Sequence, residues 1–155
     1  MQSAINEQIN FEMFSANTYL SMSAYFAQQG LDGFAHWYYM QYKEELAHAE
    51  DMMHYVITRG GKVEIKAVAA VETEFNSPLE IAEKAYHHEC LVSEKIENIV
   101  RIASEEKDMP SQDFFWKYIR EQVEEEANAT TLIDRIRLSE GHSLLFLDKE
   151  LGERK

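Results

Sequence analysis

The sequence contains few of the residues that cross-link a chain or turn it sharply. Its 155 residues include one cysteine, two prolines and six glycines. Cys90 alone cannot form an internal disulfide or a Cys-x-x-Cys metal or redox centre. A sheet of many strands needs turns rich in proline and glycine, so the scarcity of both residues favours long helices.

Long apolar runs and excess positive charge are also missing. No run of about 18 apolar residues is present, and the amino terminus has no basic segment followed by an apolar one, so we expect neither a membrane span nor a secretory signal. A cytoplasmic protein is the corresponding expectation. The net charge of −13 argues against binding to nucleic acid and suits cations, although the same charge also keeps a protein in solution.

What is present predicts one all-α domain spanning residues 1–155. Hydrophobic residues make up 45% of the chain, enough to bury a continuous core. Four long segments carry apolar residues at helical spacings of three and four, which predicts a four-helix bundle. The predicted inward positions, helix by helix, are Ile5, Ile9, Glu12, Ala16, Tyr19, Ser23 and Phe26; Phe34, Tyr38, Gln41, Glu45, His48, Met52 and Tyr55; Leu79, Ala82, Tyr86, Glu89, Ser93, Ile96, Val100 and Ala103; Phe115, Tyr118, Gln122, Glu125, Ala129, Leu132 and Ile136.

The segments between these patterns predict how the helices are connected. Residues 62–76 show no clean helical period, so we expect a long crossover between the second and third helices. Ser77 is expected to cap the third helix, and Ser111 the fourth. Gly141 is expected to end the fourth helix. Residues 144–151 predict a short, very apolar fifth helix, whose surface needs cover and so indicates self-association.

Polar residues interrupt the apolar pattern midway along every long helix. They are Glu12, Glu45, His48, Glu89, Gln122 and Glu125. Glu12 and Glu45 are 33 residues apart, as are Glu89 and Gln122, so the two helical hairpins carry these residues at matching places. At ~1.5 Å of rise per residue, the heights of Glu12 and His48 differ by only about 3 Å, and those of Glu89 and Glu125 by about 6 Å. All six side chains are therefore predicted to lie at one level of the bundle.

A buried cluster of carboxylates needs a compensating partner. Glu45 and His48, three residues apart on one helix face, have the spacing of metal ligands. A bound cation would neutralise the cluster, whereas the alternative is a set of polar residues that satisfy one another and fix the bundle register. Oxygen ligands with one imidazole suit Fe, Mn or Zn, and room for two ions would allow oxidation chemistry.

Four segments together resemble the prokaryotic non-haem ferritins. They are Asn6-Glu7-Gln8-Ile9-Asn10-Phe11-Glu12, Glu44-Glu45-Leu46-Ala47-His48, Tyr86-His87-His88-Glu89 and Glu121-Gln122-Val123-Glu124-Glu125-Glu126, and residues 146–151 match that family's final helix. The resemblance covers essentially the whole chain. It implies a ferritin-like bundle in a hollow 24-subunit homo-oligomer, a ferroxidase that oxidises Fe(II) with O₂ or H₂O₂ and stores the ferric product as a mineral.

The resemblance also implies roles for individual residues. Glu12 and His48 resemble ligands of a first iron, Glu45 resembles the bridge, and Glu89 and Glu125 resemble ligands of a second. The remaining assignments are Gln122 as the nearby amide that leaves one position open, Glu44, Glu121 and Glu124 as a third iron site, and Tyr19 as the family tyrosine that hydrogen-bonds near the centre and can lend an electron. Tyr19 is also consistent with an ordinary core residue.

Related families and other functions are separated by particular residues. A bacterioferritin would have a second Glu-x-x-His and a haem-binding Met after the bridging Glu, where this chain has Glu125 and Leu46, so no haem is expected. A rubrerythrin would need a four-cysteine site. Lys117 stands where the family usually has a Trp. Two alternatives stay open: a di-iron or di-manganese oxidase acting on a small substrate, and a helical scaffold that binds no metal.

Overall fold

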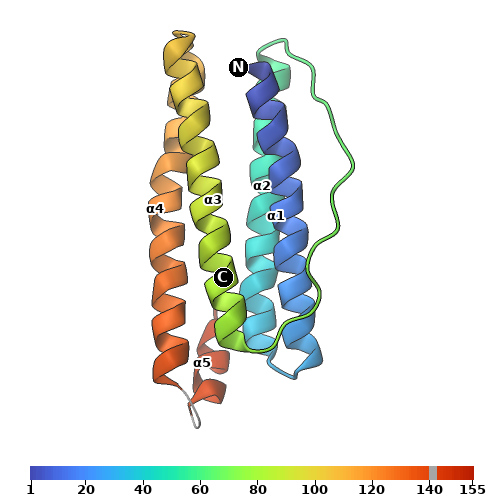
Figure 1. Ribbon diagram of the computed structural model, residues 1–155, viewed down its shortest axis with the longest axis vertical. Coiled ribbons are helices and arrows are strands. Elements are labelled where there is room, and N and C mark those ends of the chain that lie inside the picture. The colour runs from blue at the N-terminus through green and yellow to red at the C-terminus, as the bar shows by residue number, and fades with distance from the viewer. Residues whose placement is uncertain (140–142) are drawn as a thin grey trace.

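The chain folds into a bundle of long helices, as predicted. A computed structural model describes residues 1–139 and 143–155. Its elements are α1 (Gln2–Gln28), α2 (Asp32–Thr58), α3 (Pro78–Glu105), α4 (Met109–Leu138) and α5 (Leu144–Leu151). Four helices run side by side, and the short α5 lies at one end of the bundle (Figure 1). The described residues contain no strand, so the all-α four-helix bundle with a fifth helix is confirmed.

Residues 61–77 form the long crossover between α2 and α3. They have no regular secondary structure and run along the outside of α1 for most of the bundle's height (Figure 1). Asn6 donates to the carbonyl of Lys62 at 2.9 Å and accepts from the amide of Glu64 at 2.8 Å. Asn10 donates to the carbonyl of Glu64 at 2.8 Å and accepts from the amide of Lys66 at 2.7 Å. Two side-chain amides on α1 thus satisfy polar backbone groups in the first part of the crossover, at Lys62, Glu64 and Lys66.

Side-chain caps fix the starts of α3 and α4. The hydroxyl of Ser77 accepts from the backbone amide of Glu80 at 3.1 Å, which confirms Ser77 as a cap. For α4 the prediction was wrong, because Asp108 is the cap and Ser111 lies inside the helix. Asp108 accepts both the amide of Ser111, at 3.2 Å, and its hydroxyl, at 2.7 Å, so the carboxylate satisfies two donors. Gly141, the predicted end of α4, lies outside the described residues.

Two apolar clusters make up the core, one on each side of a polar layer. The first cluster, toward the α5 end, contains Tyr19, Phe26, Phe34, Tyr38, Ile81 and Leu132, and the second, toward the amino-terminal end, contains Ile5, Ile9, Met52, Ile96 and Phe115. Along α1, Glu12 lies between Ile9 of one cluster and Tyr19 of the other. The polar residues predicted to share one level therefore divide the core.

The buried stripe of α3 is the part of the core that the sequence placed least well. Glu89 and Ile96 are buried as predicted, but several predicted inward residues are only half-buried: Leu79, Tyr86, Ser93 and Val100. The buried positions that the pattern did not single out are Ile81, Ala85, Val92 and Ile99. The buried stripe of α3 is therefore shifted to one side of the predicted stripe, which corresponds to a rotation of the helix about its axis.

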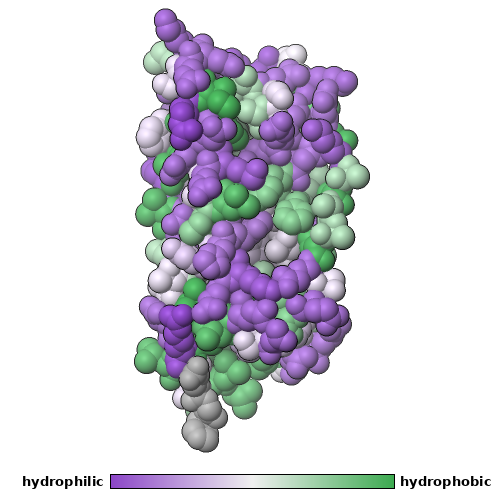
Figure 2. All heavy atoms as spheres, viewed as in Figure 1, coloured by the Kyte–Doolittle hydropathy of each residue, from purple (hydrophilic) through white to green (hydrophobic). Residues whose placement is uncertain are grey.

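Helix α5 packs closely against the start of α2. A Cβ added at Gly33 would lie 1.6 Å from the carbonyl oxygen of Asp148, so only glycine permits this approach. The backbone amide of Phe34 donates to Asp148 Oδ1 at 2.9 Å. Leu145 and Phe146, on the outer side of α5, are 72% and 73% exposed. Hydrophobic side chains gather at this end of the molecule (Figure 2).

Among the described residues, no helix is both long enough and apolar enough to cross a membrane.

Candidate metal centre

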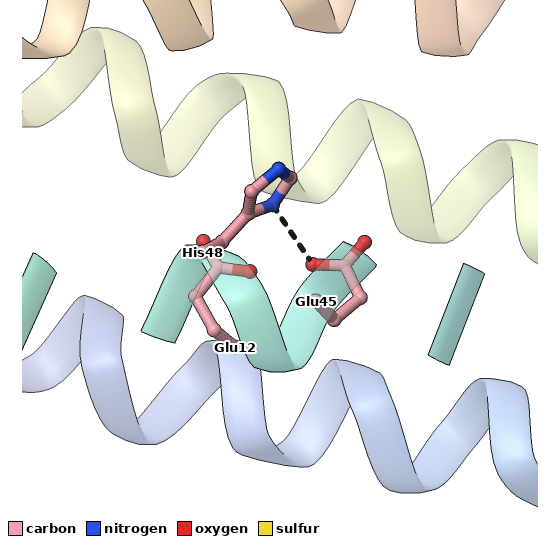
Figure 3. A group of neighbouring side chains, drawn as sticks. All are labelled: Glu12, Glu45 and His48. Carbon is pink, nitrogen blue, oxygen red and sulfur yellow. Dashed lines mark ion pairs between the residues drawn. The ribbon is translucent and has the colours of Figure 1, made fainter. Parts of the chain in front are cut away.

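Three side chains from α1 and α2 form a compact group within the polar layer. Glu12 projects from α1, while Glu45 and His48 project from one face of α2 (Figure 3). One potential ligand atom from each residue lies within 4.8 Å of the other two. Two carboxylates and one imidazole at this separation could share a metal ion.

The two carboxylates of this group are deeply buried and incompletely hydrogen-bonded. Glu12 and Glu45 are 1% and 4% exposed. Glu12 Oε1 accepts from Gln8 Nε2 at 2.7 Å, but Oε2 of Glu12 and Oε2 of Glu45 have no hydrogen-bond partner among the described residues. Burial raises the pKa of Glu12 well above its usual value and that of Glu45 to about 8. A cation placed here would supply the missing partner and favour the charged forms.

His48 is oriented by a carboxylate on the opposite side of the bundle. Its Nδ1 lies 3.6 Å from Glu45 Oε2, and its Nε2 lies 3.1 Å from Glu121 Oε1 on α4. Burial alone would lower the pKa of His48, but the hydrogen bond to Glu121 and the negative charges of Glu12, Glu121 and Glu44 together outweigh burial and raise it. When Nε2 carries the hydrogen bonded to Glu121, the lone pair of Nδ1 points toward the carboxylates. A metal-binding histidine is usually held in this way.

Glu89 enters the layer from α3 and is held by two neutral donors. The hydroxyl of Tyr19 donates to Glu89 Oε1, and Gln122 Nε2 donates to Glu89 Oε2 at 3.0 Å. Glu89 is 2% exposed, and burial raises its pKa. The sequence was consistent with Tyr19 as either a core residue or a site residue. In the structure Tyr19 contacts a candidate ligand directly.

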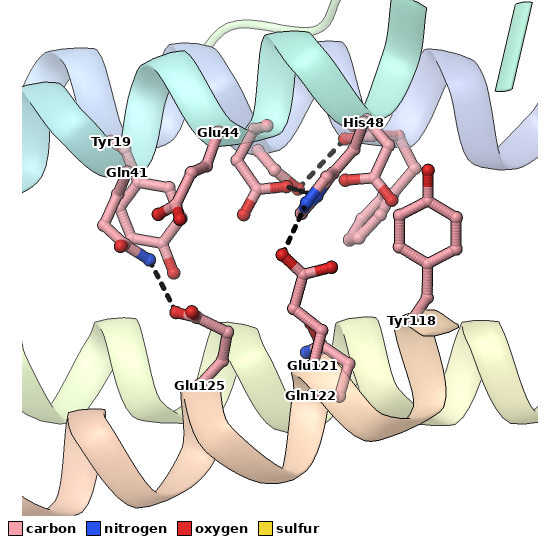
Figure 4. A network of polar contacts seen from close by, with 12 residues as sticks. Tyr19, Gln41, Glu44, His48, Tyr118, Glu121, Gln122 and Glu125 are labelled. Atoms are coloured by element: carbon pink, nitrogen blue, oxygen red, sulfur yellow. Dashed lines mark hydrogen bonds and ion pairs between the residues drawn. The ribbon is translucent and has the colours of Figure 1, made fainter. Parts of the chain in front are cut away.

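Glu125 faces the layer from α4. It accepts from Gln41 Nε2 on α2 at 2.9 Å (Figure 4). Burial raises the pKa of Glu125 to about 7. In the residues described, neither Glu89 nor Glu125 joins the group of Glu12, Glu45 and His48 whose ligand atoms lie within 4.8 Å of one another. The structure brings all five to one level but gathers only three into a compact group.

The three residues predicted to form a third iron site have separate surroundings. Glu44 pairs with Arg154, with Oε2 and Nη2 at 2.5 Å. Glu121 holds His48, and this bond lowers the pKa of Glu121. Glu124 is exposed. The predicted third site is therefore not assembled as one cluster of carboxylates.

No role was predicted for three residues that support the site, namely Gln8, Gln41 and Arg154, although Gln41 was predicted to face inward. Gln8 and Gln41 each lie four residues before a buried glutamate, Glu12 and Glu45 respectively, and each donates to a carboxylate of the layer. For Gln8 the available signal was an amide one helical turn before a buried acid, since such pairs face one another. Gln41 donates to Glu125 on α4, a contact that spacing within α2 does not indicate. Arg154 lies beyond the last helix, where no periodic pattern could indicate its contact.

Taken together, the fold and the buried group define a four-helix bundle protein with a carboxylate–histidine site able to hold a metal ion. Residues 2–139 match the model of the ferritin-like domain. The chain belongs to the ferritin family, as the sequence resemblance predicted.

Individual relatives are similar over nearly their full lengths. A bacterial non-heme ferritin of Bacteroides fragilis is 46% identical over 154 residues, which cover 99% of this chain and 97% of the relative. One from Staphylococcus aureus is 36% identical over 153 residues, covering 97% and 92%. A solved open pore ferritin from the archaeon Archaeoglobus fulgidus superposes with a TM-score of 0.97 at 44% identity, covering 100% of this chain and 97% of that one.

Proposed function

We propose that this protein is an iron-storage ferritin, with a ferroxidase centre inside each chain and a shell of 24 subunits around a ferric mineral. The observation that carries the proposal is the buried group of Glu12, Glu45 and His48, two of whose carboxylate oxygens have no hydrogen-bond partner among the described residues. Such a group is costly to bury unless a cation binds to it. The names of the relatives support iron as that cation.

Fe(II) is the substrate in this proposal. Glu12 and His48 bind the first ion, Glu45 bridges, and Glu89 and Glu125 bind the second. The last two carboxylates accept from the neutral amides of Gln122 and Gln41 rather than from ammonium or guanidinium donors. A carboxylate bonds less strongly to a neutral amide than to an ammonium or guanidinium group, so an arriving cation can recruit both carboxylates at small cost.

Protons balance the charge of the arriving ions. Because burial raises the pKa of Glu45 to about 8 and that of Glu125 to about 7, both groups hold protons for part of the time at neutral pH. A metal ion binds the ionised form, so Fe(II) displaces these protons. Two adjacent ions then each give one electron to O₂ or H₂O₂. The amide of Gln122 leaves a position free for the oxidant.

The residues around the centre have two proposed roles: one positions an iron ligand, and the others bind iron that leaves the centre. Tyr19 donates its phenolic hydrogen to Glu89 and keeps that carboxylate in place. Glu44, Glu121 and Glu124 are proposed to form the third iron position, sharing Glu125, through which iron passes toward the mineral. Fe(II) is proposed to enter the shell through acidic pores. The protein is proposed to be cytoplasmic.

Anaerobic titration of the metal-free protein with Fe(II), followed by exposure to air and size-exclusion chromatography with iron detection, tests the proposal. We expect two or three ions per chain, and after oxidation large iron loads that elute with a particle of about 24 subunits. Iron that stays at two ions per chain on a small oligomer would instead indicate an oxidase acting on a small substrate. Absence of tight binding would leave the scaffold alternative.

A matched pair of variants ties the activity to the centre. Glu45→Ala removes the proposed bridge, so rapid oxidation is expected to disappear while the shell stays folded. Glu50→Ala, on an exposed position of the same helix, is expected to oxidise iron normally. Equal oxidation rates in both variants would refute the assignment of Glu45.

The cavity beside Glu125 is too small for the organic substrate of an oxidase. This cavity is lined by apolar side chains that include Tyr38, Ala82 and Leu132, and its volume is about 20 Å³. This volume accommodates about one water molecule. An organic substrate would require the helices to separate.

A further inference from the structure

The carboxyl-terminal tail returns from α5 to α2 and places one arginine against the proposed iron path. The chain ends part-way up the bundle, away from α5 (Figure 1). Arg154 Nη1 donates to the carbonyl of Trp37 at 3.1 Å, and its guanidinium lies over the Trp37 ring, 4.3 Å from the centroid. His36 Nε2 lies 2.5 Å from the carbonyl oxygen of Arg154. Backbone and side chain of Arg154 are therefore both held by α2.

The free edge of the same guanidinium points at a proposed iron ligand. Arg154 Nη2 donates to Glu44 Oε2 at 2.5 Å. The side chain of Arg154 is only 18% exposed, although it belongs to the second-to-last residue of the sequence. A mobile surface arginine would pair with carboxylates only weakly, since fixing a long side chain costs entropy. The contacts with Trp37 have already restricted this side chain, so the pair with Glu44 is preorganised.

The charge of Arg154 also reaches the metal centre. Glu44 and Glu125 point toward the same space between α2 and α4 (Figure 4). Burial raises the pKa of Glu125, and the nearby positive charge of Arg154 counteracts part of that increase. The guanidinium thus lies where it compensates acidic groups on both helices, which is the role that a third metal ion would have.

We propose that Arg154 is a resident cation at the third iron position and competes with iron for Glu44. This inference rests on the proposed function, since it assigns a residue to the passage of iron away from the ferroxidase centre. An ion that binds Glu44 displaces the guanidinium, and the guanidinium returns when the ion leaves. Occupancy of the third position is therefore brief, and iron is passed on rather than held.

Binding of Zn(II) tests the competition without relying on activity. Zn(II) is used in place of Fe(II) because it is not oxidised. Isothermal titration calorimetry of the metal-free full-length protein is compared for wild type, Arg154→Ala and Arg154→Lys. We expect the third Zn(II) to bind about tenfold more tightly to Arg154→Ala, because a charge-assisted hydrogen bond no longer has to be broken. Arg154→Lys, which keeps the charge without the planar fork, is expected to lie between the two.

Arg135→Ala is the matched control. Arg135 pairs with Glu150 of α5, so this variant removes the same charge and loosens the same end of the chain without touching Glu44. Its third Zn(II) is expected to bind as in wild type. Equal third-ion affinity in wild type and Arg154→Ala, or no third ion in either, would overturn the inference. Failure of the first two ions to bind would instead refute the proposed function.

Trp37 offers a second readout, because the guanidinium lies over its ring. In a Trp116→Phe background Trp37 is the remaining tryptophan. We expect its emission to change as the third equivalent of Zn(II) binds and displaces Arg154, and to stay constant when Arg154→Ala is added to the background. Emission that does not respond to the third ion in the Arg154 protein would show that the tail is only a structural contact.

Discussion

Replacing Glu45 by glutamine should make the metal-free protein more stable at neutral pH while removing its metal site. Glu45 is 4% exposed, and burial raises its pKa from 4.5 to about 8. Between these two values the folded protein binds a proton that the unfolded chain releases. The contribution of Glu45 to the free energy of unfolding is therefore fully present below about pH 4.5 and is lost as the pH rises toward 8. Glutamine has the same shape and no such titration.

The expected magnitude follows from the difference between the two pKa values. Each unit of pKa difference corresponds to about 1.4 kcal/mol, so the free energy of unfolding of the wild type falls by about 5 kcal/mol across the whole window. At pH 7 the loss is about 3 kcal/mol, and above pH 8 it levels off. Glu45→Gln lacks this loss, so its advantage over wild type should increase from near zero at pH 4.5 to about 3 kcal/mol at pH 7.

Urea unfolding of both proteins in EDTA, followed by far-UV circular dichroism at equal subunit concentration, measures this difference. Glu50→Gln, on an exposed position of α2, is the control and should follow the wild-type pH dependence. Adding Zn(II) at pH 7 should stabilise the wild type more than Glu45→Gln, because ligand binding to the folded state adds stability and the variant lacks the bridging ligand. Parallel pH profiles for wild type and Glu45→Gln would refute the argument that burial holds this carboxyl protonated.

Three further substitutions test other parts of the structure. Gly33→Ala places a methyl group against the carbonyl of Asp148, so α5 should separate from α2 at a cost of about 3 kcal/mol, measured as a lower melting temperature and faster proteolysis at the carboxyl terminus. Ser77→Ala removes the cap of α3 and should cost about 1 kcal/mol in urea unfolding, without affecting metal binding. Tyr19→Phe leaves one oxygen of Glu89 without its donor, so we expect iron oxidation to slow severalfold in a shell of normal size, by stopped-flow absorbance.

The sequence predicted the polar layer well because helix geometry alone determines it. Glu12, Glu45 and Glu89 interrupt apolar stripes at matching distances from the helix ends, and a constant rise per residue converts those distances into a common height. All three are buried at that height. The identity of the apolar neighbours has little influence on this argument, which is why it needed no tertiary information.

Predictions that depended on the rotation of a helix about its axis, or on a choice between two possible cap residues, were less successful. The rotation of α3 is set by packing against neighbouring helices, so its periodicity did not reveal that Val92 and Ile99 face the core. Asp108 and Ser111 are both good caps, and only the bend of the chain before α4 decides between them. The contact of Arg154 with Glu44 joins residues 110 positions apart outside any repeating pattern.

The way α1 holds the crossover has a consequence for how this stretch of chain can change over evolutionary time. On the crossover, the side-chain amides of Asn6 and Asn10 hydrogen-bond to main-chain groups of residues 62–66, in the way that the backbone of a neighbouring strand would. Any residue other than proline offers the same groups. Side chains of α1 thus fix the path of this part of the crossover, and the sequence of its outward-facing residues can change without altering that path.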